Sequence, residues 1–387
     1  MAYTTNTLTN IAPILLKEGL ASLRENAVMA SLCGYDVKAE AAQKNATISV
    51  VLPYAVPAQE VVVATQTTAT PLIPTTVDIT LANWWEASFS LSDKDMAELR
   101  PGFLPMAAAE AIKSLANKVD ISLLNLYKDI YGAVGTYNAT PDGLDDLANC
   151  RKMLNKQLAP LNDRVMIISP EAEAGFLGVD QFIGADKTGG TQALRDASLG
   201  RLFGFDIYMD QNVPNHTKGT LVSSVPDCAV KDIVAAGLKA AVLNNSSGTG
   251  TLAGTLVAGD IITFANQTQQ YVITALATAG SQECAITFEP ALKTALADGT
   301  LVTIQGSCSQ NLAFQKGAFC FASRPLASLV DSGLGSIISS DIDPVSGLSL
   351  RLEISRYNRQ TRFSYDILWG VKTIRREYAT RLIGTTV

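Results

Sequence analysis

The single histidine, His216, is the side chain with the widest chemical range in this sequence. It lies in the loop-like stretch NVPNHTKG. An imidazole can act as a general base, but the sequence identifies no nucleophile or carboxylate beside it. Serine and cysteine triads usually need such a base, so neither class gains support. We therefore expect no enzyme and no catalytic residue.

Motifs that hold cofactors or metals are also missing. GTGTLAG (248–254) departs from the dinucleotide fingerprint, and no phosphate-binding G-x-x-x-x-G-K-[ST] occurs. DIDPVSG (341–347) has acidic spacing faintly like a calcium loop, but Pro344 and the missing downstream glutamate favour a polar turn. The six cysteines are widely spaced, which predicts buried thiols and no zinc cluster. We expect no cofactor and no metal.

A few residues are candidates for contacts with other protein chains. Trp84 and Trp85 are adjacent, so on a strand they face opposite sides. Either one is core and the other an exposed contact, or both are covered within the fold. From Arg351 to the end there are eight basic and three acidic side chains, a net +5, while the rest of the chain carries −11. Arg375 and Arg376 in this segment are expected to meet acidic groups across an interface, with DNA phosphates as the alternative.

Length and composition predict a folded protein of two or three domains. The 387 residues are 47% hydrophobic and 17% charged, which supports a substantial core. The net charge of −6 argues against a chain that coats nucleic acid with its whole surface. The N-terminus lacks the pattern of a secretory signal, and no apolar run is long enough to span a membrane. We expect a soluble protein that is made in the cytosol.

Hydrophobic periodicity predicts the elements of the N-terminal half. Residues 9–32 are expected to form a helical arm. Residues 47–93, interrupted by Pro53, Pro57 and further prolines, are expected to form a long two-stranded excursion. Between 103 and 131, apolar residues recur every three or four positions, which predicts a long amphipathic helix.

The C-terminal half alternates between mixed and purely β character. We expect a helix over 142–158, a buried strand followed by a helix over 164–177 with Ser169 as N-cap, and a strand over 200–214. Between 220 and 310, short β-branched runs separated by turn residues predict a small closed all-β module inserted into another domain. The segment after Ser349 predicts two or three antiparallel strands, paired across the turn 358–360.

This order of elements resembles the major capsid proteins of tailed double-stranded DNA phages. More narrowly, it is similar to the coat proteins of short-tailed, scaffold-assisted phages that carry an inserted β-barrel domain. The residues that carry the likeness are LGRLFGFDIYMDQNVP (199–214) before the insertion, AGDIITF (258–264) within it, and NLAFQKGAFCFASRPL (311–326) after it. The resemblance implies an α+β fold in which Leu312, Phe314, Phe319, Phe321 and Leu326 belong to the core of the host domain.

The resemblance also implies a division of the chain into five parts. They are an N-terminal arm (1–45), an extended loop (46–93), a peripheral domain with the long spine helix (94–140 and 346–387), an axial domain (141–219 and 311–345) and the inserted barrel (220–310). In this arrangement the extended loop, with Pro53 and Pro57, lies over a neighbouring subunit. The candidate intersubunit contacts are therefore Pro53, Pro57, Trp84, Trp85, Arg375 and Arg376.

By the same resemblance the chain forms an icosahedral shell, first a procapsid and then a mature head, around double-stranded DNA. Its partners would be further copies of itself in hexamers and pentamers, a scaffolding protein, a portal, the packaged DNA through non-specific contacts and, in some relatives, a decoration protein, with no membrane. The location would be the virion capsid, assembled in the host cytoplasm. Two alternatives stay open: a secreted or surface β-rich adhesin that binds carbohydrate, and a shell subunit of a protein nanocompartment.

Overall fold

The computed structural model describes most of the chain and divides it into two compact units. The described residues are 28–33, 46–52, 74–98, 103–183, 199–223, 228–246, 251–280, 282–326, 337–342 and 347–385, with single positions 16, 17, 19, 20, 58, 60, 61, 63, 71 and 197. Unit 1 comprises Met1–Ser31, Tyr35–Ala116 and Cys320–Ile374, and unit 2 comprises Leu32–Gly34, Asn117–Phe319 and Arg375–Val387. Most of the arm predicted over 9–32 lies outside the described residues, and the short 3-10 helix η1 (Met29–Leu32) is described at its end.

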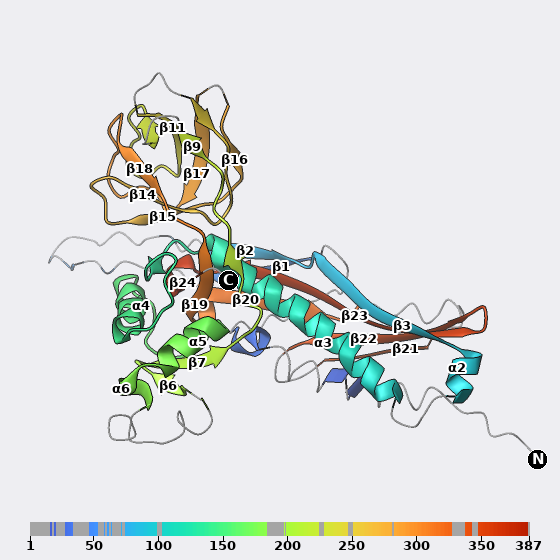
Figure 1. Ribbon diagram of the computed structural model, residues 1–387. Helices are drawn as coiled ribbons and strands as arrows, with labels where there is room; N and C mark the ends of the chain where they lie inside the picture. The colour runs from blue at the N-terminus through green and yellow to red at the C-terminus, as the bar shows by residue number, and fades with distance from the viewer. Residues whose placement is uncertain are drawn as a thin grey trace, which may run out of the picture. The chain divides into compact units, whose positions relative to one another are not determined.

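The main sheet of unit 1 has five strands, in the order β20-β23-β22-β21, with β3 added on β23 (Figure 1). These strands are β3 (Asn83–Ser92), β20 (Phe319–Arg324), β21 (Ile337–Ile342), β22 (Ser349–Tyr357) and β23 (Gln360–Thr373). Asn358 and Arg359 connect β22 to β23, and both have positive φ angles, 46° and 61°. A two-residue hairpin turn needs this conformation. The predicted pairing across this turn is confirmed.

One face of this sheet is apolar because alternate residues of each strand point to the same side. Phe363, Tyr365 and Ile367 of β23 are each at most 2% exposed. Phe363 stacks on Phe89 of β3, with ring centroids 5.2 Å apart. The opposite face carries the charged and hydroxyl side chains of the same strands, and α2 (Asp93–Glu98) follows β3 directly.

The predicted excursion over 47–93 is two separate structures, which corrects the expectation. β1 (Thr47–Leu52) pairs with β2 (Thr75–Thr80) as a hairpin, whereas β3 pairs with β23 over ten residues. The hairpin also does not stand free of the unit, since Ile48, Val50 and Ile79 are buried in a cluster with Leu368 and Cys320. The physical reason is that one face of β1 and β2 is apolar enough to pack on the sheet.

The long helix is confirmed, with a tighter end than the pattern predicted. α3 spans Phe103–Leu124 and continues as the 3-10 helix η2 (Asn125–Asp129). Ile112, Leu115, Val119 and Leu123 of its buried face are at most 2% exposed. Within unit 1, a Cβ at Gly19 would lie 2.6 Å from Cδ1 of Ile112 and 3.1 Å from Cδ2 of Leu350. A larger residue at this position would displace these two side-chain ends, so glycine allows the close packing between the helix and β22.

Unit 2 contains a second sheet, in the order β4-β24-β19-β5-β7-β6, with β8 paired to β19. Its strands are β4 (Ala133–Val134), β5 (Arg164–Ile168), β6 (Arg201–Leu202), β7 (Phe205–Met209), β8 (Asn215–His216), β19 (Cys308–Gln315) and β24 (Ala379–Gly384). The helices α4 (Leu144–Lys156), α5 (Pro170–Leu177) and α6 (Asp180–Ile183) accompany it. Leu147, Leu154 and Phe176 join Met166 and Phe205 in one core cluster. The predicted N-cap is confirmed, because the Ser169 hydroxyl accepts a hydrogen bond from the amide of Ala172.

Two strand predictions for this unit need correction. The strand expected over 200–214 is a short hairpin of β6 and β7, because Phe203 and Gly204 adopt positive φ and turn the chain. The final strand, β24, does not extend the β22–β23 hairpin and instead pairs with β19 and β4. The short 3-10 helix η5 (Arg376–Tyr378) redirects the chain before β24 begins.

The inserted module is a closed six-stranded barrel, in the order β10-β11-β17-β15-β14-β18, which Figure 1 draws in yellow and orange. Its strands are β10 (Cys228–Lys231), β11 (Ala240–Asn245), β14 (Ile261–Phe264), β15 (Gln270–Ile273), β17 (Cys284–Glu289) and β18 (Leu301–Ile304). Two small pairs flank it: β9 (Val222–Ser223) with β12 (Leu252–Ala253), and β13 (Thr255–Leu256) with β16 (Ala277–Thr278).

The barrel structure explains why its sequence contains few large or charged residues. The rings of Phe264, Tyr271 and Phe288 fill its centre, with centroids 5.2 to 5.7 Å apart. The alternate positions, such as Ala285 and Thr287 of β17, face outward and need only small residues. The apolar segment that follows re-enters the host domain as β19, η3 (Lys316–Ala318) and β20, and its Leu312, Phe314, Phe319 and Phe321 are buried. Leu326 is partly buried. The predicted α+β fold with an inserted all-β barrel is confirmed.

Candidate functional site

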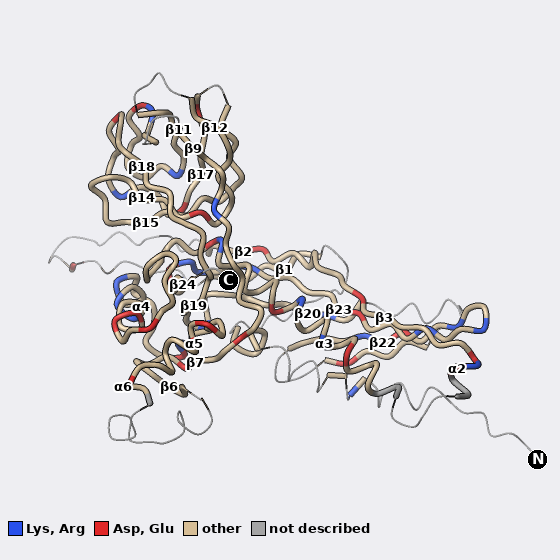
Figure 2. The backbone as a smooth tube through the Cα atoms, in the orientation of Figure 1, with Lys and Arg blue, Asp and Glu red and all other residues tan. Residues whose placement is uncertain are grey.

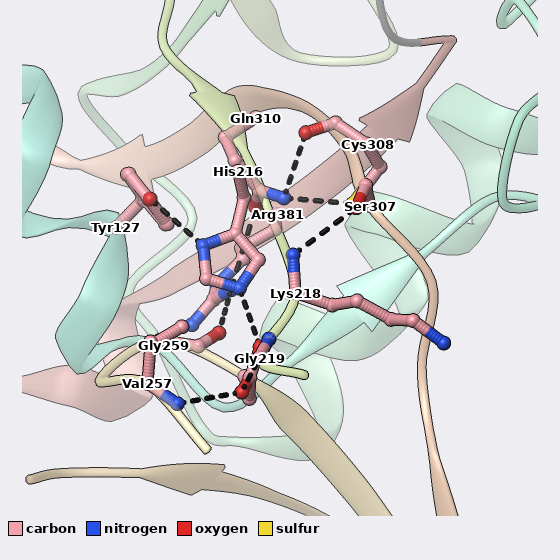
Figure 3. Close-up of polar contacts among 11 residues, drawn as sticks. Tyr127, His216, Lys218, Gly219, Val257, Gly259, Ser307, Cys308, Gln310 and Arg381 are labelled. Carbon is pink, nitrogen blue, oxygen red and sulfur yellow. Dashed lines mark hydrogen bonds and ion pairs between the residues drawn. The ribbon is translucent and has the colours of Figure 1, made fainter. Parts of the chain in front are cut away.

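His216 lies at the centre of a buried polar cluster where the barrel meets the sheet of unit 2 (Figure 3). Its Nδ1 is 2.9 Å from the Tyr127 hydroxyl, and its Nε2 is 2.8 Å from Oδ1 of Asp260. Tyr127 comes from η2, His216 from β8, and Asp260 from the turn before β14. All three residues are at most 5% exposed. Three elements that are distant in sequence thus converge on one imidazole.

The chemistry of the partners assigns the proton of the neutral imidazole. A carboxylate only accepts hydrogen bonds, so Nε2 carries the proton and donates to Asp260. Nδ1 is then an acceptor, and the Tyr127 hydroxyl donates to it. Burial raises the pKa of Tyr127 to about 12, so this phenol keeps its proton at neutral pH.

Asp260 is the anchor of the cluster because it also accepts hydrogen bonds from the backbone. The amide of Gly219 lies 3.1 Å from Oδ2, and the amide of Val257 lies 2.8 Å from the same oxygen. Gly219 belongs to the segment that leads from β8 into the barrel. A Cβ at this position would lie 2.2 Å from the carbonyl oxygen of Thr255. The carboxylate therefore holds the entry to the barrel against its base.

Arg381 of β24 completes the cluster from the side of the sheet. It is fully buried, and its Nη1 donates to the carbonyl of Gly259 at 2.8 Å and lies 3.4 Å from Oε1 of Gln310. Its guanidinium lies 5.2 Å from the centre of the Tyr127 ring, a distance at which a cation is attracted to an aromatic face. Burial lowers the pKa of Arg381 to about 10.

This arrangement can position the barrel but cannot perform chemistry on a substrate. The Asp–His–Tyr line has the order of a proton relay, yet its members lie beneath the surface and the tyrosine is not an accessible nucleophile. Two further bonds tie the parts together: the amide of Lys218 donates to the Ser307 hydroxyl, and the amide of Ala133 donates to Oε1 of Gln270. We therefore interpret the cluster as a lock between the barrel and its host sheet.

His216 is conspicuous in the sequence, whereas Tyr127, Asp260 and Arg381 are not. Tyr127 lies 89 residues and Asp260 lies 44 residues from the histidine, so no local pattern connects them. Asp260 is the one charged residue of the stretch AGDIITF, which otherwise has the pattern of a strand. Among the described residues, no group of three His, Cys, Asp or Glu side chains could hold a metal ion. In the described part of the chain, no helix is long and apolar enough to cross a membrane.

The tryptophan pair is placed differently from either expectation. Trp84 and Trp85 are 46% and 47% exposed, so neither is core and neither is covered. They lie on opposite faces of β3: Trp85 pairs with Ile367, and Trp84 donates its indole N–H to Asp366 at 3.0 Å. An edge strand has neighbours on one side only, which leaves both indoles half in water. Pro53 and Pro57 lie outside the described residues.

Several arginines of the basic C-terminal segment pair with acidic side chains of the same chain, and the expected contacts of Arg375 and Arg376 with a neighbouring subunit stay a prediction. Arg376 lies 3.3 Å from Glu289 and 3.8 Å from Asp129, while Arg375 lies over the Tyr378 ring. The other pairs with acidic residues are Arg351 with Asp366, Arg356 with Asp93, and Arg362 with Glu86. In Figure 2 basic and acidic positions accordingly lie close together along β3, β22 and β23. Burial raises the pKa of Glu86, but hydrogen bonds from Ser364, Arg362 and Ser88 outweigh it and lower the pKa overall.

Comparison with known proteins gives structural likenesses only. No family model and no curated protein sequence matches the chain. It is similar to a solved structure from Mycobacterium phage Che8, at 16% identity over 92% of this chain and 90% of that one, with a TM-score of 0.49. It is also similar to the capsid of cyanophage P-SCSP1u (13% identity, 92% and 88% covered, TM-score 0.48) and to the mature capsid of bacteriophage PhiM1 (11%, 89% and 83%, 0.45).

In the described part of the chain, the long helix, the inserted barrel and the C-terminal strands follow one another in the predicted order.

Proposed function

We propose that this chain is the major capsid protein of a tailed phage, a non-enzymatic subunit that assembles into an icosahedral shell around double-stranded DNA. The observation that carries the proposal is the exposed apolar surface of its extended elements. Val51 on the hairpin is 60% exposed, Trp85 on the edge strand 47%, and Tyr357 at the end of β22 79%. Large apolar side chains spread along such elements are covered when copies of the subunit pack together.

Weak contacts between subunits are sufficient to hold such an assembly together. Each contact between copies can be weak, because symmetry repeats it many times in a closed shell. The proposal includes hexamers and pentamers of the subunit, a scaffolding protein, a portal and a location in the virion. It also includes the division of the chain into five parts, among them the arm (1–45) and the barrel (220–310). Pro53 and Pro57 remain candidates for the contact with a neighbour.

Trp85→Ala should separate assembly from folding. Because the indole is already half exposed in the subunit, we expect the free energy of unfolding to fall by about 1 kcal/mol. A tryptophan buried at an interface contributes 2 kcal/mol or more there, about thirtyfold in affinity, so the yield of sedimenting particles should fall by at least about tenfold. Sucrose-gradient sedimentation and urea unfolding measure the two effects. If the folded variant forms particles at the wild-type yield, Trp85 does not contribute to the interface.

A further inference from the structure

Part of the outer edge of β3 in unit 1 carries backbone groups that no described residue pairs. β3 pairs with β23 only, so its other side is an edge of the sheet (Figure 1). In an antiparallel ladder, alternate residues direct their N–H and C=O groups to opposite sides of the strand. The amide of Asp93 donates to the carbonyl of Arg359, which marks these two positions as a hydrogen-bonded pair. Glu86, Ser88 and Ser90 lie an odd number of residues before Asp93 and therefore direct their backbone groups outward.

The open stretch of this edge is short and has a defined centre. Beyond Ser90, the outward amide of Ser92 already donates to Oδ2 of Asp95 at 3.1 Å, which closes that end. Glu86, Ser88 and Ser90 are exposed, and within the described part of the chain nothing bonds to their outward amides or carbonyls. Three residues with Ser88 in the middle are therefore available to a further strand.

This edge lacks the protection that edge strands usually carry. Natural sheets block further pairing with prolines, bulges or charged side chains, above all lysine. Residues 87–91 (ASFSL) contain no proline and no charge, and the ladder to β23 runs over ten residues without a bulge. Trp85, beside this stretch, is 47% exposed. Such an edge is a template for a strand of another chain.

We propose that β3 pairs with β3 of a second copy of this chain, antiparallel and centred on Ser88. Glu86 then lies opposite Ser90 of the other copy, and each of the three opposed pairs exchanges two backbone hydrogen bonds. Charge favours this register. Arg362, which pairs with Glu86 of its own chain, lies opposite Ser90 on β23, so the register adds the Glu86 carboxylate of the other copy on the same rung and the same face.

The same register covers apolar side chains on the other face of the sheet. Trp85 lies opposite Leu91 of the other copy, and Ala87 lies opposite Phe89. Because β3 meets itself, each contact occurs twice. The strand is thus complementary to itself in hydrogen bonding, in charge and in apolar contact, and a second copy supplies all three. The pairing rests on the proposed function, in which copies of the subunit lie side by side, and names one contact between them.

Cysteine crosslinking in the full-length chain tests the register. The Cα atoms of a hydrogen-bonded antiparallel pair are about 5.5 Å apart, a distance that a disulfide spans. We therefore expect Ser88→Cys to give a disulfide-linked dimer on a non-reducing gel after mild oxidation. The wild-type chain provides the background, because five of its cysteines are buried and Cys33 is partly buried.

Ser90→Cys is the matched control on the same edge. In the proposed register, residue 90 of one copy lies four residues from residue 90 of the other, about 13 Å along the strands, which is too far for a disulfide. We expect at least about tenfold less dimer from this variant. Equal yields from Ser88→Cys and Ser90→Cys would overturn the register.

Ser90→Pro, combined with Ser88→Cys, tests the backbone hydrogen bonds. The amide of Ser90 points away from β23, so proline removes no bond of the ladder, and the melting temperature should change by only a few degrees. Each copy loses one hydrogen bond to the other, which should weaken the pairing about thirtyfold. A dimer yield that proline leaves unchanged would overturn the proposal.

The crosslink and the particles are scored separately in the same preparation. Shells without a Ser88→Cys crosslink would overturn the pairing and leave the proposed function standing. A crosslink in a chain that forms no particles would support the pairing and count against the proposed function.

Discussion

Asp260→Ala is expected to lower the free energy of unfolding by about 3–5 kcal/mol. The substitution removes the acceptor of two buried donors, Nε2 of His216 and the amide of Gly219, and of the partly buried amide of Val257. Each unsatisfied buried donor costs about 1–3 kcal/mol. Urea unfolding followed by tryptophan fluorescence and circular dichroism measures the loss.

Asp298→Ala is the control for that change. Asp298 also lies on a barrel turn and accepts a backbone hydrogen bond, from the amide of Asp232, but this bond is exposed to water. We expect a loss below about 1 kcal/mol, because water replaces the lost acceptor. Similar losses in both variants would contradict the interpretation of Asp260 as the anchor of a lock.

Replacing residues 53–74 by an Asn-Gly turn is expected to abolish shells and spare the fold. Leu52 and Thr75 are paired at the last rung of the β1–β2 ladder, so a two-residue turn can close the hairpin there. The base of the hairpin keeps Ile48, Val50 and Ile79 in the core of unit 1, and the melting temperature should change by only a few degrees. The proposed contact with a neighbour would be lost.

Size-exclusion chromatography and circular dichroism on the same preparation read out this variant. A folded monomer that no longer sediments as particles is the expected result. Shells at the wild-type yield would show that the segment 53–74 has no part in holding neighbouring subunits.

Local sequence patterns predicted the positions of helices and strands better than they predicted which strands pair with each other. The spacing of Ile112, Leu115 and Val119 predicted α3, and the turn at Asn358 predicted the β22–β23 hairpin, because both depend on neighbours in sequence. The pairing of β3 with β23 and of β24 with β19 depends on strands more than 60 residues away, and alternation alone does not choose between partners.

Separation in sequence also explains why the partners of His216 and of the C-terminal arginines could not be predicted. His216 was conspicuous as the single histidine, but Asp260 and Arg381 become partners only through the closure of the barrel against the sheet. The net charge of the C-terminal segment gave no sign that Asp366 and Glu86 lie opposite its arginines once the strands pair. Segregation of charge along a sequence does not imply segregation in space.

Electron microscopy of the purified full-length chain, expressed alone and together with candidate scaffolding proteins, tests the proposed function most directly. We expect closed, uniform shells or tubular assemblies of the same lattice in at least one of the two conditions. Discrete monomers under both conditions would contradict it, and would favour a β-rich binding protein instead.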